Sequence, residues 1–142
     1  MSITSATAVY MLSVQSLFPT PQQLQGFSAD EVYATDPIDS AEVLMGIDGY
    51  MSAGFVFVPI KQNISLQADS ASNTIFQVWW ESQQLIKDLY IANGTIRLPS
   101  IGQKLTMTNG VLTTFPPLAD AGKTLKPRKY GITWNSVIPA PI

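Results

Sequence analysis

The sequence contains no cysteine and no histidine among its 142 residues. The absence of cysteine excludes disulfide bonds, thiolate metal sites and a cysteine nucleophile. The absence of histidine excludes an imidazole general base, a Ser-His-Asp triad and histidine-ligated zinc or haem. Because the commonest catalytic and metal-binding groups are missing, we expect no enzyme activity, no metal and no cofactor.

Charge is also scarce, since charged residues make up 13% of the chain and hydrophobic residues 46%. An average soluble protein has about 25% charged residues. A chain this apolar is not disordered, and it has few charges to cover a large free surface, so we expect much of its exterior to lie against partners. The length predicts one domain over residues 1–142, with an extended lead at residues 1–6 and an extended tail at residues 139–142.

Long hydrophobic runs are absent as well. The longest have about four or five residues, such as Phe55-Val56-Phe57-Val58, and a membrane span needs about 20. Residues 1–4 lack the basic and apolar regions of a signal peptide. We therefore expect a soluble protein that is made in the cytoplasm and has no membrane partner.

The few charges are unevenly distributed along the chain. Residues 1–96 contain nine acidic and two basic side chains, whereas residues 97–142 contain six basic side chains and one acidic. Such a chain can be complementary to copies of itself, or its two halves can neutralise each other within one subunit, and the sequence leaves both possibilities open. The acidic stretch begins with Asp30 and Glu31, and the candidate residues for contacts between subunits are Asp36, Asp39, Glu42, Asp48, Lys123, Lys126, Arg128 and Lys129.

Two of these groups have alternative interpretations. Asp36, Asp39 and Glu42 could seat a hard cation, but their spacing matches no EF-hand loop, and a solvated acidic loop is the preferred interpretation. The basic run at residues 123–129 could contact phosphates, meet an acidic patch on a neighbouring subunit, or keep the segment soluble.

Most of the chain has the pattern of β-strands. Pro19-Thr20-Pro21 is expected to end the first strand, and a less regular strand follows at residues 22–33. Asp48-Gly49 and Asn109-Gly110 are hairpin-turn signals, which predict one hairpin of residues 41–47 with 50–58 and another of residues 103–108 with 111–115. The remaining strands are expected at residues 7–18, 61–69, 95–98 and 130–138.

One segment has a helical period. Its apolar residues recur at spacings near 3.6 and predict an amphipathic helix from about residue 73 to residue 90, with caps in residues 70–73 and closure by Asn93-Gly94. We assign the apolar stripe to core or subunit contacts rather than to a ligand platform; its residues are Ile75, Phe76, Trp79, Trp80 and Ile86. The order of strands, one helix and strands predicts a mainly β protein, an antiparallel β-sandwich or small barrel with one flanking α-helix.

Three stretches carry a resemblance to a known family. Residues 64–73 run from a strand straight into a Ser/Asn-capped helix, residues 45–49 look like an early hairpin turn, and residues 129–134 look like a closing strand. Over residues 30–138 the chain resembles the tail tube proteins of bacteriophages with contractile tails, whose fold is shared with the tube proteins of type VI secretion systems.

The resemblance implies a virion structural protein of the tail, made in the cytoplasm of the host bacterium. In that family six subunits close into a ring around a continuous β-barrel, and rings stack head to tail into the channel for DNA ejection. The implied partners are further copies of the chain, the tail sheath protein, and baseplate and tail-terminator proteins, with transient non-specific passage of viral DNA.

Two alternatives remain open from the sequence. The chain could be another tail or baseplate ring protein of the same fold. It could also be a β-sandwich module that binds a receptor or a carbohydrate, with Trp79, Trp80 and Trp134 as the contact residues.

Overall fold

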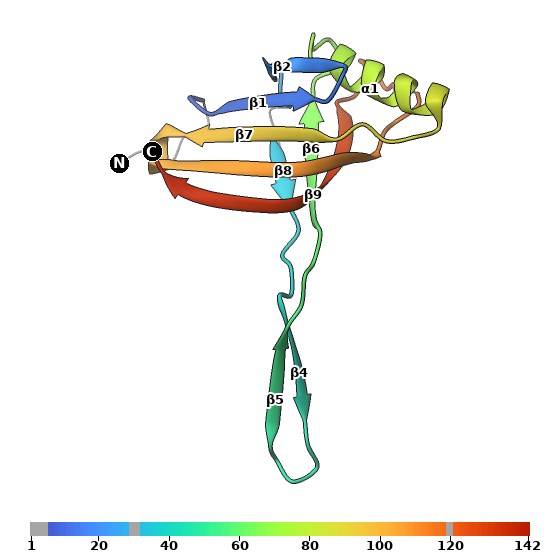
Figure 1. Ribbon diagram of the computed structural model, residues 1–142. Helices are drawn as coiled ribbons and strands as arrows, with labels where there is room; N and C mark the ends of the chain where they lie inside the picture. The colour runs from blue at the N-terminus through green and yellow to red at the C-terminus, as the bar shows by residue number, and fades with distance from the viewer. Residues whose placement is uncertain (1–5, 29–31, 119–120) are drawn as a thin grey trace.

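The computed structural model describes residues 6–28, 32–118 and 121–142. The chain folds into a strongly curved sheet with one helix at its flank, and a long hairpin projects from it (Figure 1). This architecture confirms the predicted mainly β class with one flanking α-helix. The elements are β1 (Val9–Val14), β2 (Phe18–Gln23), β3 (Tyr33–Thr35), β4 (Ala41–Met45), β5 (Met51–Phe55), β6 (Ile60–Leu66), α1 (Asn73–Ile86), β7 (Ala92–Leu98), the 3₁₀ turn η1 (Pro99–Ile101), β8 (Gln103–Thr114) and β9 (Arg128–Pro141).

Seven strands form one antiparallel sheet in the order β2-β1-β7-β8-β9-β6-β3. β9 joins the two halves of this sheet, because residues 128–134 pair with β6 whereas residues 131–141 pair with β8. The strand changes direction between its two partners, so β6 and β3 run across the direction of β7 and β8 (Figure 1). The resulting curvature lets the sheet enclose a core on its concave side.

The core lies between the curved sheet and α1. The Phe76 ring of α1 stacks on the Tyr130 ring of β9 with 4.2 Å between centroids, and the Tyr130 hydroxyl donates a 2.8 Å hydrogen bond to Asn73 Oδ1. These contacts fasten the helix to the sheet at its first turns. The largest fully buried side chains are Trp79, Trp134, Tyr10, Tyr130, Phe76, Leu12, Ile64, Leu66, Ile96, Met107, Ile132 and Val14.

The helix ends earlier than the sequence predicted. The apolar period continued to residue 90, but α1 stops at Ile86 because Lys87 adopts the left-handed conformation at φ 54° and donates its N–H to the Gln83 carbonyl. Beyond Lys87 the backbone N–H groups no longer bond to helical carbonyls. The Tyr90 N–H, for example, donates to the side-chain oxygen Oε1 of Gln83 at 3.3 Å. The predicted closing pair, Asn93-Gly94, lies inside β7.

The start of the helix is at the predicted place but is not capped as predicted. Ser72 is the N-cap residue, yet its side chain makes no cap hydrogen bond. Its Oγ accepts the Gln25 N–H at 2.8 Å instead, which ties the helix start to the segment after β2. Asn73 extends this anchor, because its amide nitrogen donates to the carbonyl oxygens of Gln67 and Ala68.

The predicted hairpin at Asn109-Gly110 is wrong. β8 runs through both residues as one continuous strand from Gln103 to Thr114. Asn109, at φ 51°, is accommodated as a bulge opposite β7, where the pairing shifts between Ala92–Gly110 and Gly94–Met107. Position 110 must be glycine for packing rather than for a turn, because a Cβ there would overlap the indole ring of Trp134. Pairing with β9 on the other side holds the strand straight and overrides the local turn signal.

The ends of the chain also differ from the predicted strands. The strand expected at residues 7–18 is β1 followed by a turn, and Pro19 and Pro21 lie within β2 instead of ending a strand. They are tolerated there because β2 is at the edge of the sheet.

The irregular strand expected at residues 22–33 is not formed in the described residues after β2, where Phe27 makes an isolated bridge to Leu66. The expected tail at residues 139–142 is mostly strand, because β9 pairs with β8 as far as Pro141, and residues 1–5 of the lead lie outside the described residues.

Candidate assembly surfaces

A long hairpin leaves the body of the protein between β3 and β6 (Figure 1). β4 and β5 form a separate two-stranded sheet, and every residue from 35 to 57 is exposed. We call residues 36–59 the arm. The hairpin predicted for residues 41–47 with 50–58 is confirmed, with its paired strands at residues 41–45 and 51–55.

One face of the arm is wholly apolar. Side chains that pair directly across two strands share a face, and the pairs on this face are Ala41–Phe55, Val43–Ala53 and Met45–Met51. An isolated two-stranded hairpin is only marginally stable in water, and contiguous apolar surface of this kind is typical of an interaction site. The arm therefore has the properties of a segment that is completed by a partner.

The tip of the arm presents a further apolar side chain. The Gly46 N–H donates to the Tyr50 carbonyl at 2.7 Å, and the Asp48 carboxylate accepts the Tyr50 N–H at 3.1 Å. Gly49, at φ 86°, supplies the left-handed conformation that this turn requires. The turn leaves Ile47 fully exposed at its end, so the hydrogen bonds of the tip hold an isoleucine out into solvent.

The acidic candidates gather on the arm. Asp36 and Asp39 lie before β4, Glu42 lies on β4, and Asp48 lies in the tip; no basic residue occurs between residues 32 and 60. Asp30 and Glu31 lie outside the described residues. Within the described ranges, no group of three or more carboxylates is close enough together to hold a metal ion.

The basic candidates lie at the opposite end of β6. β6 runs from Ile60, which follows the arm, to Leu66, and antiparallel β9 places Arg128 opposite Leu66 and Lys129 opposite Ser65. A strand of this length spans about 20 Å. The acidic arm and the first residues of β9 are therefore at opposite ends of the body, as Figure 1 shows.

The loop that carries the other two lysines is fixed at both of its ends beside α1. At its start the Phe115 ring stacks on Trp80 with 4.8 Å between centroids. At its finish the Arg128 guanidinium donates to the Pro116 carbonyl at 3.0 Å and lies 5.5 Å from the centre of the Phe115 ring. Lys123 and Lys126 are exposed between these two anchors. We call residues 121–129, together with Leu118, the basic end.

Arg128 differs from the three lysines of the basic end. It is half-buried, its guanidinium lies over Phe115 and Tyr130, and its buried Nε has no hydrogen-bond partner. Lys123, Lys126 and Lys129 are exposed. Across the described part of the chain no acidic side chain forms an ion pair with a basic one, so direct pairing does not neutralise the two charge groups within the subunit there.

The helix stripe divides into a buried part and an exposed part. Phe76 and Trp79 are fully buried, and Ile75 and Trp80 pack against the core from half-buried positions. Ile86 is half exposed, near Leu85 and Leu89, which are also exposed. The described helix is not long and apolar enough to cross a membrane.

The tryptophans do not form a surface platform. Trp79 and Trp134 have no exposed area, and their indole N–H groups donate to the Tyr90 carbonyl and to Gln62 Oε1. The interpretation of Trp79 and Trp134 as carbohydrate contacts is therefore wrong for this structure, since a sugar cannot reach them.

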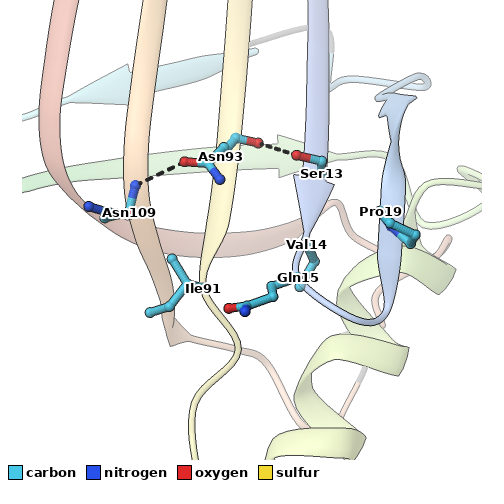
Figure 2. Close-up of a pocket in the computed structure, with 7 residues that line it drawn as sticks. All are labelled: Ser13, Val14, Gln15, Pro19, Ile91, Asn93 and Asn109. Carbon is cyan, nitrogen blue, oxygen red and sulfur yellow. Dashed lines mark hydrogen bonds between the residues drawn. The ribbon is translucent and has the colours of Figure 1, made fainter.

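A polar hollow of about 390 Å³ lies where β1, β7 and β8 meet. Figure 2 shows Asn93 at its centre, with the Ser13 hydroxyl donating to the Asn93 carbonyl and the Asn109 N–H donating to the Asn93 side chain. No titratable side chain is among the described residues that line it, which are Ser13, Val14, Gln15, Pro19, Ile91, Asn93 and Asn109. The Asn93 side chain accepts the Asn109 N–H of the β8 bulge, and the described lining residues place no general base beside the Ser13 hydroxyl.

Solved structures that share this fold include chains of contractile injection systems. A chain of the anti-feeding prophage baseplate superposes with a TM-score of 0.59 at 12% identity, covering 99% of this chain and 98% of that one. A chain of the PVC sheath–tube complex in the extended state superposes at 0.57 with 13% identity, covering 94% and 88%. A chain of the anti-feeding prophage tube-terminating cap superposes at 0.59 with 11% identity, with the same coverage of 94% and 88%. At these identities the likeness establishes the fold.

Residues 1–138 match the family described as tail fiber protein gp32. The chain therefore belongs to the tail fiber protein gp32 family. No curated protein matches it by sequence.

Proposed function

We propose that the protein is a self-assembling subunit of the tail tube of a contractile phage tail. In this proposal six copies close into a ring, and rings stack head to tail to form the channel through which DNA is ejected. The arm is the observation that carries the proposal, because a hairpin exposed from residue 35 to residue 57 with a wholly apolar face requires a covering partner.

Copies of the same chain are the simplest partner for the arm. The chain has few charges with which to keep an exterior in solvent, and a symmetric assembly covers the same surface on every subunit at once. The resemblance to tail tube proteins and the shared fold support rings and stacks as the form of that assembly.

The lateral contact in such a ring cannot be a full strand ladder at β2. The sheet ends in β2 on one side and β3 on the other. Pro19 and Pro21 have no N–H to donate, so β2 cannot continue a regular ladder into a neighbouring subunit. Ring closure at this edge must use side chains, while β3 retains its backbone donors.

Partners beyond the chain itself follow from the same proposal. The structures with this fold are named as a sheath–tube complex, a baseplate and a tube-terminating cap, and we accordingly propose tail sheath, baseplate and tail-terminator proteins as neighbours. The proposed location is the virion tail, and the proposed role involves no catalysis.

A second candidate is a receptor-binding component elsewhere in the tail. The family description, which names a tail fiber protein, favours it. In this role the arm would dock on a different tail protein, and the purified chain alone would stay monomeric.

Electron microscopy with light scattering of the purified chain separates the two candidates. The tube proposal expects rings or tubes from the unmodified chain, and loss of stacked tubes from Val43→Ser/Met51→Ser, which makes the apolar face of the arm more polar. Ile101→Ser is the matched control, because it removes a similarly exposed apolar side chain from η1. A monomeric unmodified protein, or assembly that is indifferent to the arm variant, would contradict the proposal.

A further inference from the structure

We propose that the arm of one copy docks on the basic end of the next copy, with the acidic side chains of the arm facing Lys123, Lys126 and Lys129. The inference rests on the proposed function, since it names the two surfaces through which self-assembly occurs. It assigns a partner surface to the arm and a role to the densest group of bases in the chain.

The first argument is that one copy cannot satisfy its own charges. The arm follows β3 and precedes Ile60, whereas Lys129 and Arg128 pair with the far end of β6, about 20 Å away along the strand. The arm also projects away from the body rather than back toward that end (Figure 1). The two groups are therefore brought together only when a second copy is placed at the end of the first.

The second argument is the composition of the two surfaces. The arm carries acidic side chains and no base, and residues 121–129 carry four bases and no acid. Each surface also has exposed apolar side chains, since the arm offers its apolar face and Ile47 and the basic end offers Leu118 and Leu125. Apolar contact at the centre with opposite charges around it is the usual composition of a specific interface.

The third argument is the polarity of the arrangement. The two complementary surfaces are different patches of one chain, so a contact between them is heterologous and repeats in one direction. Every added copy presents a fresh arm at one end and a fresh basic end at the other. Such a contact builds a stack with all subunits pointing the same way, as head-to-tail assembly requires.

Arg128 has a positioning part in this contact. Its guanidinium is occupied by Pro116, Phe115 and Tyr130 of its own subunit, so it holds the loop that presents the lysines. Replacing it would disturb the loop itself, and the charge reversals below therefore leave it intact. Asp48 is left intact for the same reason, because its carboxylate accepts the Tyr50 N–H in the tip.

The test uses two charge-reversed variants of the full chain. One is Lys123→Glu/Lys126→Glu/Lys129→Glu, whose arm and basic end are both acidic. The other is Asp36→Lys/Asp39→Lys/Glu42→Lys, in which both are basic. A single exposed pair contributes little, so three reversals are needed to act jointly at each repeat. The matched control is Lys61→Glu/Lys87→Glu/Lys104→Glu, which makes the same change in net charge at exposed positions outside the two surfaces.

At low salt we expect each reversed variant to stay folded and to form no stacked tubes at concentrations where the unmodified chain does, with the critical concentration for stacking raised about tenfold or more. Mixing the two variants restores assembly. The acidic arm of the first variant then meets the unchanged basic end of the second, and the basic arm of the second meets the reversed, acidic end of the first. The control variant assembles like the unmodified chain. Circular dichroism and thermal melting check the fold, and sedimentation and electron microscopy measure assembly.

The results that overturn the inference are distinct from failure of the proposed function. Normal tubes from either reversed variant, no assembly from the mixture, or an equal loss in the control would each show that the arm and the basic end do not face each other. Failure of the unmodified chain to assemble at all would contradict the proposed function instead.

Discussion

Trp79→Ala is the most demanding test of how the helix is held on the sheet. Trp79 has no exposed area, its ring lies 6.3 Å from the Phe76 ring in a stacked arrangement, and its indole N–H donates to the Tyr90 carbonyl at 3.2 Å. The substitution therefore removes a large buried ring and leaves a backbone carbonyl without its donor. Both losses occur where α1 meets the core.

The expected cost is a large part of the total stability. Truncation of a buried tryptophan to alanine costs about 3–5 kcal/mol, and a domain of this size has a free energy of unfolding of about 5–15 kcal/mol. For a chain of this length the loss corresponds to a fall in Tm of about 10–15 °C. We expect the variant to be poorly soluble and unable to assemble at growth temperature.

Thermal and urea unfolding of the soluble fraction measure the effect. The control is Leu85→Ala on the same helix, where the side chain is 84% exposed, and it is expected to change stability by less than about 0.5 kcal/mol. A Trp79→Ala protein that melts within about 3 °C of the unmodified chain and assembles normally would refute the reasoning.

Three further predictions concern a glycine, alkaline pH and metal removal. Gly110→Ala is expected to destabilise the protein by about 1–3 kcal/mol in urea unfolding, because its Cβ would overlap the Trp134 indole, and an unchanged midpoint would contradict that packing. Burial raises the pKa of the Tyr10 hydroxyl, which donates to Gln62. The unfolded chain loses this proton first, so above about pH 10 Tyr10 should lower the free energy of unfolding by about 1.4 kcal/mol per pH unit, in addition to smaller losses of the same sign from Tyr33 and Tyr130, whose pKa burial also raises. A Tyr10→Phe variant that shows the same alkaline loss would assign it elsewhere. EDTA should leave Tm and assembly unchanged, and a lower Tm on chelation would revive a cation site at Asp36, Asp39 and Glu42.

Elements with a strong local pattern could be predicted from the sequence. The helix was predicted because Phe76 and Trp79 recur at helical spacing, and the first hairpin because Asp48-Gly49 separates two apolar runs. The end of the helix could not be predicted, because the apolar period continued past Lys87 while the backbone turned left-handed there. Periodicity reports which face is apolar, and it does not report where the backbone leaves the helix.

Tertiary pairing decided the elements that were predicted wrongly. Asn109-Gly110 has the composition of a hairpin turn, but β7 and β9 pair with β8 on both sides and hold it extended. Pro19 and Pro21 predict the end of a strand, but β2 lies at the edge of the sheet, where the missing N–H groups of the two prolines are tolerated. In each case a distant strand, which local sequence does not reveal, determined the outcome.

The sequence predicted that the acidic and basic residues form two separate groups, but it did not predict where in the fold the two groups lie. The sequence separates the acids from the bases, and only the register of β6 with β9 puts Lys129 at the end opposite the arm. The apolar face of the arm was missed because it becomes visible only when Val43 is paired with Ala53 and Met45 with Met51. The signal that could have found it is the cross-strand pairing implied by the Asp48-Gly49 turn.

The most direct test of the central claim is electron microscopy of the purified, unmodified chain at low salt. Assembly through the arm predicts rings or tubes of uniform diameter, in which each subunit points the same way and the β4–β5 hairpin lies against a neighbouring copy. Discrete monomers at every concentration, or rings in which the arm remains uncovered, would contradict it.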